Sequence, residues 1–316
     1  SARAGYSFDD VAVAPHRRTR DPEAVDLGWQ IDAYGFALPL VAAPMDSIMS
    51  PETAIEMGQA GCLGVLNLEG LWTRYADPSD AFEQIRAASA HDSVALLQRL
   101  YAEPIKPELI IERVRQMRAA NITVAASLSP QKTHDLFGHV IEAGVDVFVI
   151  RGTTVSAEHV SAGNEPLNLK RFIYELDVPV LVGGVATYQS ALHLMRAGAA
   201  GVLVGFGGGA THTTADVLGV RVPMATAVAD VAAARRDYLD ESGGRYVHVV
   251  ADGAMGRSGD IVKAIACGAD AAMVGSPLAR ASEAPGAGKH WGMEATHAEL
   301  PRGEVVEFET LGTLAE

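Results

Sequence analysis

The sequence predicts an α/β fold in which eight parallel strands and their helices close into a (β/α)8, or TIM, barrel. Its length of 316 residues suits one such barrel with extensions, because these barrels typically run to about 250 residues or more. A sequence motif also recurs, in which a helical pattern ends at a glycine and is followed by a short apolar run. The four copies of this motif begin at Ala60, Ala143, Ala197 and Cys267. Glycine ends helices in the left-handed conformation, and strands that are apolar on both faces are typical of parallel sheets covered by helices.

Four further short apolar segments complete the set of eight strands. They cover residues 38–43, 122–127, 179–183 and 247–251 and fall between the repeats. Helical patterns lie at residues 108–119, 190–196, 225–239 and 260–266. Eight alternations of strand and helix favour a closed parallel barrel over an open sheet.

Two segments are predicted to extend the barrel, which is interpreted as a single domain over residues 1–316. Residues 68–121 form an elaborated connection with a helix near residues 81–90 and an apolar piece at 94–98. Residues 285–316 are predicted to be a flap-like tail, with a strand-like stretch at 304–308.

The composition argues against several classes of partner. The formal net charge is −14, whereas a surface for nucleic acid or an anionic membrane needs a basic face. No apolar run reaches the ~18 residues needed to span a bilayer, and residues 1–6 do not resemble a signal peptide. The two cysteines, Cys62 and Cys267, are far apart and lack metal-ligand spacing, so we expect no disulfide framework and a cytoplasmic location. A phosphate ligand stays compatible, because backbone N–H groups that bind phosphate do not enter a charge count.

Candidate site residues follow the strands at the carboxyl end of the barrel, where such barrels carry their reacting groups. Glycines occur in three of these loops: Gly207-Gly208-Gly209 after the sixth strand, Gly253 after the seventh and Gly275-Ser276 after the eighth. Loops without side chains let backbone amides approach a ligand, so the three together predict a phosphate cradle, although the triplet alone would be read as a flexible loop. Asp252, at the end of the seventh strand, either accepts from ribose hydroxyls or caps the helix that follows; the two interpretations are evenly balanced.

Several longer strings occur in a fixed order along the chain. They are Tyr6-Ser7-Phe8-Asp9-Asp10-Val11, Ala43-Pro44-Met45-Asp46, Ala251-Asp252-Gly253-Ala254, Ser258-Gly259-Asp260-Ile261, residues 273–279, Glu283-Ala284-Pro285-Gly286 and Trp291-Gly292-Met293. From about Tyr6 to Leu311 this series resembles the IMP dehydrogenase/GMP reductase family. The resemblance is strongest to its short bacterial "IMP dehydrogenase-related" branch, which has no inserted CBS domains.

The resemblance implies a purine nucleoside 5′-monophosphate (IMP, GMP or XMP) as ligand, NAD(P) as cofactor and a homotetramer. In this family the residue matched by Asp252 binds the ribose hydroxyls. The residues matched to the phosphate are Gly209, Gly253, Ala254, Gly275 and Ser276, and those matched along the base are Met45, Gly292, Met293 and Glu294. The carbonyls of Gly207 and Gly209 match a loop that often binds a monovalent cation such as K⁺.

One departure from the family pattern concerns the catalytic nucleophile. The family's strand-six loop reads Gly-x-Gly-x-Gly-Ser-x-Cys-Thr-Thr, and its cysteine attacks C2 of the purine; here His212 stands at that position, followed by Thr213 and Thr214. Cys62 and Cys267 are predicted to pack in the core toward the opposite end of the barrel. Without a thiolate the covalent mechanism is not available. His212 is then either a general base for direct attack by water, with Thr214 as a second catalytic candidate, or a polar loop residue.

A second departure concerns the dinucleotide. After strand four the family carries an Asp that contacts the nicotinamide ribose, whereas this chain has Arg151. A cation replaces an acceptor, so we do not expect the usual NAD(P) pose; Arg151 would bind a second phosphate or pair with a carboxylate. Gly184 stands at an expected Asn, and Trp291 and Glu294 stand at an expected Arg and Gly.

Three functions therefore stay open from the sequence. The first is an NAD(P)-dependent purine-nucleotide oxidoreductase with altered catalytic groups. The second is a catalytically silent nucleotide-binding paralogue that acts as a sensor or as a partner of a true IMP dehydrogenase. The third is a barrel enzyme that acts on another phosphorylated ligand, with His212 as acid or base.

Overall fold

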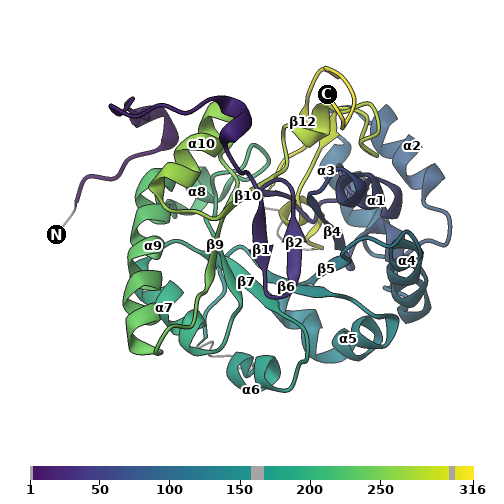
Figure 1. The fold of residues 1–316 in the computed structure, drawn as a ribbon. Helices are drawn as coiled ribbons and strands as arrows, with labels where there is room; N and C mark the ends of the chain where they lie inside the picture. Colours follow the sequence, from purple (N-terminus) through teal and green to yellow (C-terminus); the bar gives the residue numbers. More distant parts are fainter. Residues whose placement is uncertain (1–2, 158–166, 299–302) are drawn as a thin grey trace.

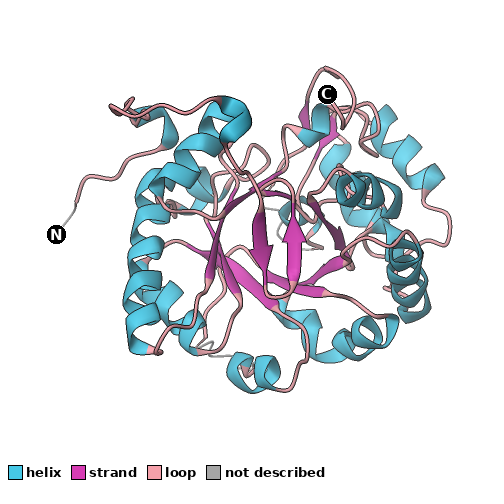
Figure 2. Ribbon diagram, in the orientation of Figure 1, coloured by secondary structure: helices cyan, strands magenta, loops and turns pink. Residues whose placement is uncertain are grey.

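A closed parallel barrel of eight strands forms the centre of the protein, with helices around it (Figures 1 and 2). The computed structural model describes residues 3–157, 167–298 and 303–316. The strand order around the barrel is β10-β3-β4-β5-β6-β7-β8-β9. The strands are β3 (Leu40–Ala42), β4 (Leu63–Asn67), β5 (Ala125–Leu128), β6 (Val147–Arg151), β7 (Val180–Val185), β8 (Gly201–Val204), β9 (His248–Asp252) and β10 (Ala271–Val274). The predicted fold class is confirmed.

The helices follow the strands along the chain. They are α1 (Pro51–Gln59), α2 (Ser79–Ala87), α3 (Ser93–Leu100), α4 (Pro107–Ala119), α5 (Pro130–Ala143), α6 (Leu169–Tyr174), α7 (Tyr188–Arg196), α8 (Thr214–Leu218), α9 (Met224–Glu241) and α10 (Ser258–Cys267). No helix among the described residues is long and apolar enough to cross a membrane.

Glycines join four of the helices to the strands that follow, as the repeat predicts. Gly61, Gly144, Gly198 and Gly268 have φ angles of 80°, 91°, 106° and 114°, in the left-handed region that favours glycine. Each reverses the chain at the amino end of the barrel, so the next strand runs in the same direction as the last. This reversal sends every strand's carboxyl end to the same side of the molecule.

Three segments differ from the sequence prediction by more than small shifts of their ends. The strand expected from residue 122 begins at Ala125. Asn121 is left-handed (φ 57°), which turns the chain just before this segment. Ile122 packs against α1, where a Cβ added to Gly58 would lie 2.8 Å from the Ile122 side chain. The apolar piece at 94–98 is part of helix α3. The strand-like stretch at 304–308 contributes only β12 (Val306–Glu307), which pairs antiparallel with β11 (Lys289–His290).

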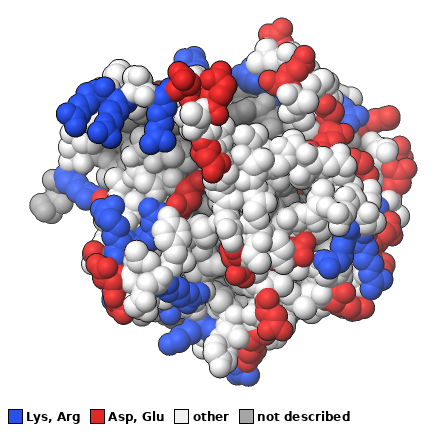
Figure 3. Space-filling model, in the orientation of Figure 1, with Lys and Arg blue, Asp and Glu red and all other residues white. Residues whose placement is uncertain are grey.

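The amino end of the barrel is covered by a hairpin that the sequence analysis did not predict. Strands β1 (Trp29–Ile31) and β2 (Tyr34–Phe36) pair antiparallel and lie across the barrel opening in Figure 1. The Trp29 indole stacks on Phe36 at 5.1 Å, and its Nε1 donates to the Leu38 carbonyl at 2.8 Å. Figure 3 shows this face, with charged side chains mainly around its edge. The opposite, carboxyl end carries the loops that the sequence singles out.

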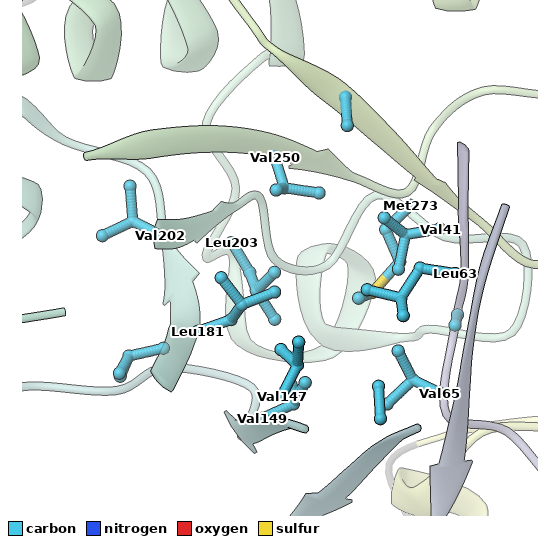
Figure 4. Packing of buried hydrophobic residues seen from close by; sticks show 14 of the residues in the cluster. Val41, Leu63, Val65, Val147, Val149, Leu181, Val202, Leu203, Val250 and Met273 are labelled. Atoms are coloured by element: carbon cyan, nitrogen blue, oxygen red, sulfur yellow. The ribbon is translucent and has the colours of Figure 1, made fainter. Parts of the chain in front are cut away.

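The core is built from the strand side chains. Val41, Leu63, Val147, Leu181 and Met273 are fully buried and lie close together in Figure 4. The register between strands places Asp252 beside Met273, and Arg151 beside Gly183. The last polar residues of β6 and β9 are thereby fixed at the carboxyl rim of a rigid core.

Candidate functional site

A cavity of about 320 Å³ opens at the carboxyl end of the barrel. Most of the residues predicted for the site line it: Met45, Arg151, Gly207, Gly209, His212, Asp252, Gly253, Ala254, Gly275, Ser276 and Glu294. The loops after β3, β6, β8, β9 and β10 and the tail all contribute. The structure thus brings together groups that lie as far apart in the sequence as Met45 and Glu294.

The three glycine turns meet in the wall of this cavity. A Cβ on Gly253 would lie 3.7 Å from the Gly209 nitrogen, and one on Gly209 would lie 2.7 Å from the His212 ring, so a side chain on Gly209 would clash. Ala254 adopts a left-handed conformation (φ 59°), which a non-glycine residue accepts only at a cost of roughly 1–3 kcal/mol. The turns are therefore closely packed, and their conformation is held by their surroundings.

Several backbone N–H groups of these turns have no protein acceptor. Within the described chain, the N–H groups of Gly209, Ala254 and Ser276 donate neither to a backbone nor to a side-chain oxygen. The Gly253 N–H differs, because it donates to the Met273 carbonyl at 3.2 Å. Free amides in a concave wall are suited to an anion.

Arg151 and Asp252 form a buried ion pair across the cavity wall. Nε of Arg151 lies 2.8 Å from Oδ2 of Asp252, and Nη2 lies 3.3 Å from Oδ1. Their side chains are 16% and 8% exposed. Burial acts to lower the pKa of Arg151, but the charge and hydrogen bonds of Asp252 outweigh it and raise that pKa. The interpretation of Asp252 as a helix cap is wrong, because Arg257 occupies the N-cap position of α10.

His212 lies against a second carboxylate of the cavity wall, Glu294. Nδ1 of His212 lies 3.3 Å from Oε1 of Glu294; the two are within ion-pair distance but are not aligned for a hydrogen bond. The Thr153 hydroxyl donates to the same carboxylate oxygen at 3.1 Å. Burial acts to raise the pKa of Glu294, but the contact with His212 and the charge of Arg151 lower it to about 2. Glu294 is therefore a carboxylate at neutral pH.

Unsatisfied polar atoms concentrate at this site. Within the described chain, five buried side-chain nitrogen or oxygen atoms lack a hydrogen-bond partner, and three of them are His212 Nδ1, Thr214 Oγ1 and Glu294 Oε2. Buried polar groups nearly always have partners, so the unpartnered atoms of His212 and Glu294, which line the cavity, indicate a place where a ligand or water supplies them.

A histidine that the sequence analysis did not single out also lines the cavity. Nδ1 of His290 lies 2.9 Å from the Ser47 hydroxyl, and its ring lies 3.4 Å from the position of a Cβ on Gly275. Burial and the nearby His212 lower the pKa of His290 to about 4, so this imidazole is neutral at pH 7. Its place in the tail gave no local signal, because tertiary packing alone brings the tail to the rim.

A hydrogen-bond network behind the cavity holds the first loop in place. Asp46 is buried and accepts from the Tyr101 hydroxyl at 2.6 Å, the Leu71 N–H at 2.6 Å and the Asn67 amide at 3.2 Å. The Trp291 indole N–H donates in turn to Tyr101 at 2.9 Å. Burial raises the pKa of Asp46, and these bonds oppose the rise. The network ties the β3 loop to the connection and to the tail, which positions Met45 in the cavity wall.

Comparison with known proteins agrees with this geometry. The family model described as "IMP dehydrogenase / GMP reductase domain" matches residues 5–298. The chain belongs to the IMP dehydrogenase/GMP reductase family.

Its relatives support the same assignment. The chain is 52% identical to a protein of Mycolicibacterium smegmatis named "Uncharacterized oxidoreductase", over 97% of this chain and 84% of the relative. It is 27% identical to the inosine-5′-monophosphate dehydrogenase of Haemophilus influenzae, over 89% of this chain and 74% of that protein. The crystal structure of an IMP dehydrogenase/GMP reductase-like protein from Corynebacterium glutamicum superposes with a TM-score of 0.94 at 51% identity, covering 99% of this chain and 84% of that one.

No thiol lies at the cavity of this family member. Cys62 is buried just before β4, and Cys267 is the last residue of α10. Both precede strands and so lie toward the amino end of the barrel. Burial raises the pKa of both thiols, which disfavours the thiolate.

Three predicted site residues lie outside the cavity wall. Thr214 is buried under the strand-six loop, where a Cβ on Gly207 would lie 3.3 Å from it. Gly292 lies behind the wall, near Thr211 and Glu294. Met293 faces a second cavity of about 570 Å³, where its sulfur lies 3.0 Å from the Asn67 amide nitrogen.

The second cavity adjoins the first. Both are lined by Arg151, Gly152, Thr153 and Glu294. One of these shared residues, Arg151, does not fit the family's dinucleotide in its usual pose. Arg151 offers only donors, and two of its nitrogens are bonded to Asp252, so it gives a ribose hydroxyl no acceptor.

Proposed function

We propose that the cavity binds a purine nucleoside 5′-monophosphate, such as IMP, GMP or XMP. The observation that carries this proposal is the meeting of three glycine turns in which the amides of Gly209, Ala254 and Ser276 have no protein acceptor within the described chain. The phosphate would lie against the backbone of Gly209, Ala254, Gly275 and Ser276. Gly253 would contribute its close backbone approach, since its N–H is bonded to Met273.

The remaining nucleotide contacts follow from the family's pattern. Asp252 would face the ribose and Met45 the base, with Glu294 accepting through its unpartnered Oε2. Gly292 and Met293 would support the base from behind the wall. We also propose a monovalent cation at the carbonyls of Gly207 and Gly209, although the Gly209 carbonyl already accepts from the His212 N–H at 3.1 Å. A homotetramer and a cytoplasmic location are proposals of the same kind.

The chemistry of an oxidoreductase in this cavity would have to proceed without a thiolate. His212 beside Glu294 has the form of a general base and its orienting carboxylate, and it would take the proton of a water that attacks C2 of the purine directly. The hydride that leaves C2 would need NAD(P)⁺ bound beside the purine as its acceptor. Thr214 has a buried hydroxyl below the same loop. This pair favours an altered enzyme, which is the first candidate.

The Arg151–Asp252 pair favours the second candidate, a catalytically silent nucleotide-binding paralogue. Arg151 occupies the Asp252 carboxylate that is proposed to bind the ribose of the nucleotide. Arg151 also stands where the family has the carboxylate that accepts from the nicotinamide ribose. In that case the protein would act as a sensor or as a partner of a true IMP dehydrogenase. NAD(P) would then have no role.

Calorimetry and a spectrophotometric assay separate these outcomes. Titration with IMP, GMP and XMP should show a dissociation constant below 1 mM for at least one, and no binding of any would reject the proposed ligand. Absorbance at 340 nm with IMP plus NAD, and with GMP plus NADPH, tests turnover. Turnover that His212→Ala abolishes supports the enzyme, whereas binding without turnover supports the silent paralogue.

A further inference from the structure

Arg280 lines the cavity as a cation whose charge no nearby carboxylate balances. It ends a short 3-10 turn, Leu278–Arg280, directly after the Gly275-Ser276 turn. Among the residues that the structure describes, no carboxylate oxygen comes within 4.0 Å of its guanidinium. Arginine stays charged at all relevant pH values, so this charge is permanent.

The other arginine and the two carboxylates of the cavity wall already have close partners. Arg151 is bonded to Asp252, and His212 lies against Glu294. His290 is neutral at pH 7 because its pKa is about 4. Among the described residues that line the cavity, Arg280 is therefore the arginine that no carboxylate contacts.

The guanidinium of Arg280 is also held in a defined place. Its central carbon lies 4.6 Å from the centre of the Phe308 ring, which lines the same cavity. Its backbone carbonyl accepts from the Leu311 N–H at 2.9 Å, so the tail is fixed against it twice. Stacking on an aromatic face leaves the edge of the guanidinium, which carries its N–H donors, free for a planar or tetrahedral anion.

We propose that Arg280 is the charged ligand of the nucleotide's phosphate and completes the uncharged backbone cradle. The backbone amides of Gly209, Ala254 and Ser276 supply direction but no net charge, whereas a phosphate monoester carries close to two negative charges at pH 7. Arg280 makes the cavity select a phosphorylated ligand over the free nucleoside. This inference rests on the proposed function and adds a specificity-determining residue to it.

The test compares Arg280→Met with Arg257→Met by calorimetry on the full chain. Arg257 is exposed on the loop after β9 and does not line the cavity. The control substitution therefore removes the same charge from the same rim without touching the cavity wall. The probes are IMP, inosine and inorganic phosphate. We expect R280M to bind IMP about 10- to 100-fold more weakly, the range for loss of a hydrogen bond to a charged group, and R257M to change it by less than about threefold.

The readouts separate a phosphate contact from a packing role. Inosine affinity should be equal in wild type and R280M, and raising the salt concentration should weaken IMP binding more in wild type than in R280M. Arg280→Lys keeps the charge but loses the paired N–H donors of the guanidinium, and we expect it to bind IMP about threefold to tenfold more weakly than wild type. This variant replaces R280M in the comparison if R280M does not fold.

Wild type that binds IMP while R280M binds it equally well would overturn the role of Arg280 and leave the proposed function standing. Phosphate binding that R280M abolishes, with no IMP binding in wild type, would instead reject the proposed ligand and keep the role of Arg280. An equal loss of IMP and inosine affinity in R280M would identify Arg280 as a packing residue and overturn the inference.

Discussion

Replacing Arg151 by Met should destabilise the protein strongly, because it leaves Asp252 as a buried carboxylate without its cation. Breaking a buried pair by removing one partner costs about 3–5 kcal/mol. The side chains of this pair are 16% and 8% exposed and one edge faces the cavity, so we expect the lower end, about 3 kcal/mol. Unfolding entropy is about 2.1 cal/mol/K per residue, so a chain of 316 residues loses about 1.5 °C in melting temperature per kcal/mol, which predicts a fall of about 4–5 °C.

A double-mutant cycle isolates the pair itself. Asp252→Asn should cost less than Arg151→Met, because Arg151 keeps the attraction of Glu294. The double variant should cost less than the sum of the singles, with a coupling of about 2 kcal/mol. Arg196→Met is the control, since its pair with Glu241 is 48% and 46% exposed, and we expect little change. A melting temperature of R151M within 1 °C of wild type, measured by circular dichroism, would show that Arg151 does not compensate the buried charge of Asp252.

Two further predictions concern the pH dependence of stability. Glu294 has a folded pKa of about 2 against the usual 4.5, so it should contribute about 3 kcal/mol above pH 4.5 that is lost as pH falls toward 2; urea unfolding at pH 7 and pH 3 should show a smaller loss in Glu294→Gln than in wild type. His290 has a folded pKa of about 4 against 6.5, so its neutral form should contribute about 3 kcal/mol above pH 6.5 that is lost as pH falls toward 4. His290→Gln should therefore flatten the stability profile between pH 6.5 and 4, and a profile that stays parallel to wild type would contradict the burial of a neutral imidazole.

The barrel could be predicted from the sequence because its signal is local and repeated. Gly61, Gly144, Gly198 and Gly268 each end a helix in the left-handed conformation before a buried strand, and this pattern needs no knowledge of distant contacts. The N-terminal hairpin escaped prediction because its strands have only three residues each, and its stability comes from contacts such as Tyr34 to Asp146, 112 residues away.

The candidate site was predictable where a loop's position follows from its strand. The end of β9 placed Asp252 at the rim, and the end of β6 placed Arg151 there, so their pairing is a consequence of the barrel. His290 and Phe308 were missed because the tail reaches the cavity only through tertiary packing. Arg280 was also missed, although it follows the strand-eight turn and its position at the rim can be read from the sequence. Met293 was predicted to lie along the base because the motif Trp291-Gly292-Met293 matches the family. Its side chain instead faces the neighbouring cavity.

The most direct test of the central claim is a crystal structure of the protein soaked with IMP. We expect the phosphate within hydrogen-bond distance of the amides of Gly209, Ala254 and Ser276, and the purine ring beside His212 with no sulfur of Cys62 or Cys267 near it. A phosphate bound away from these turns, or a cysteine sulfur in contact with C2 of the purine, would contradict this claim.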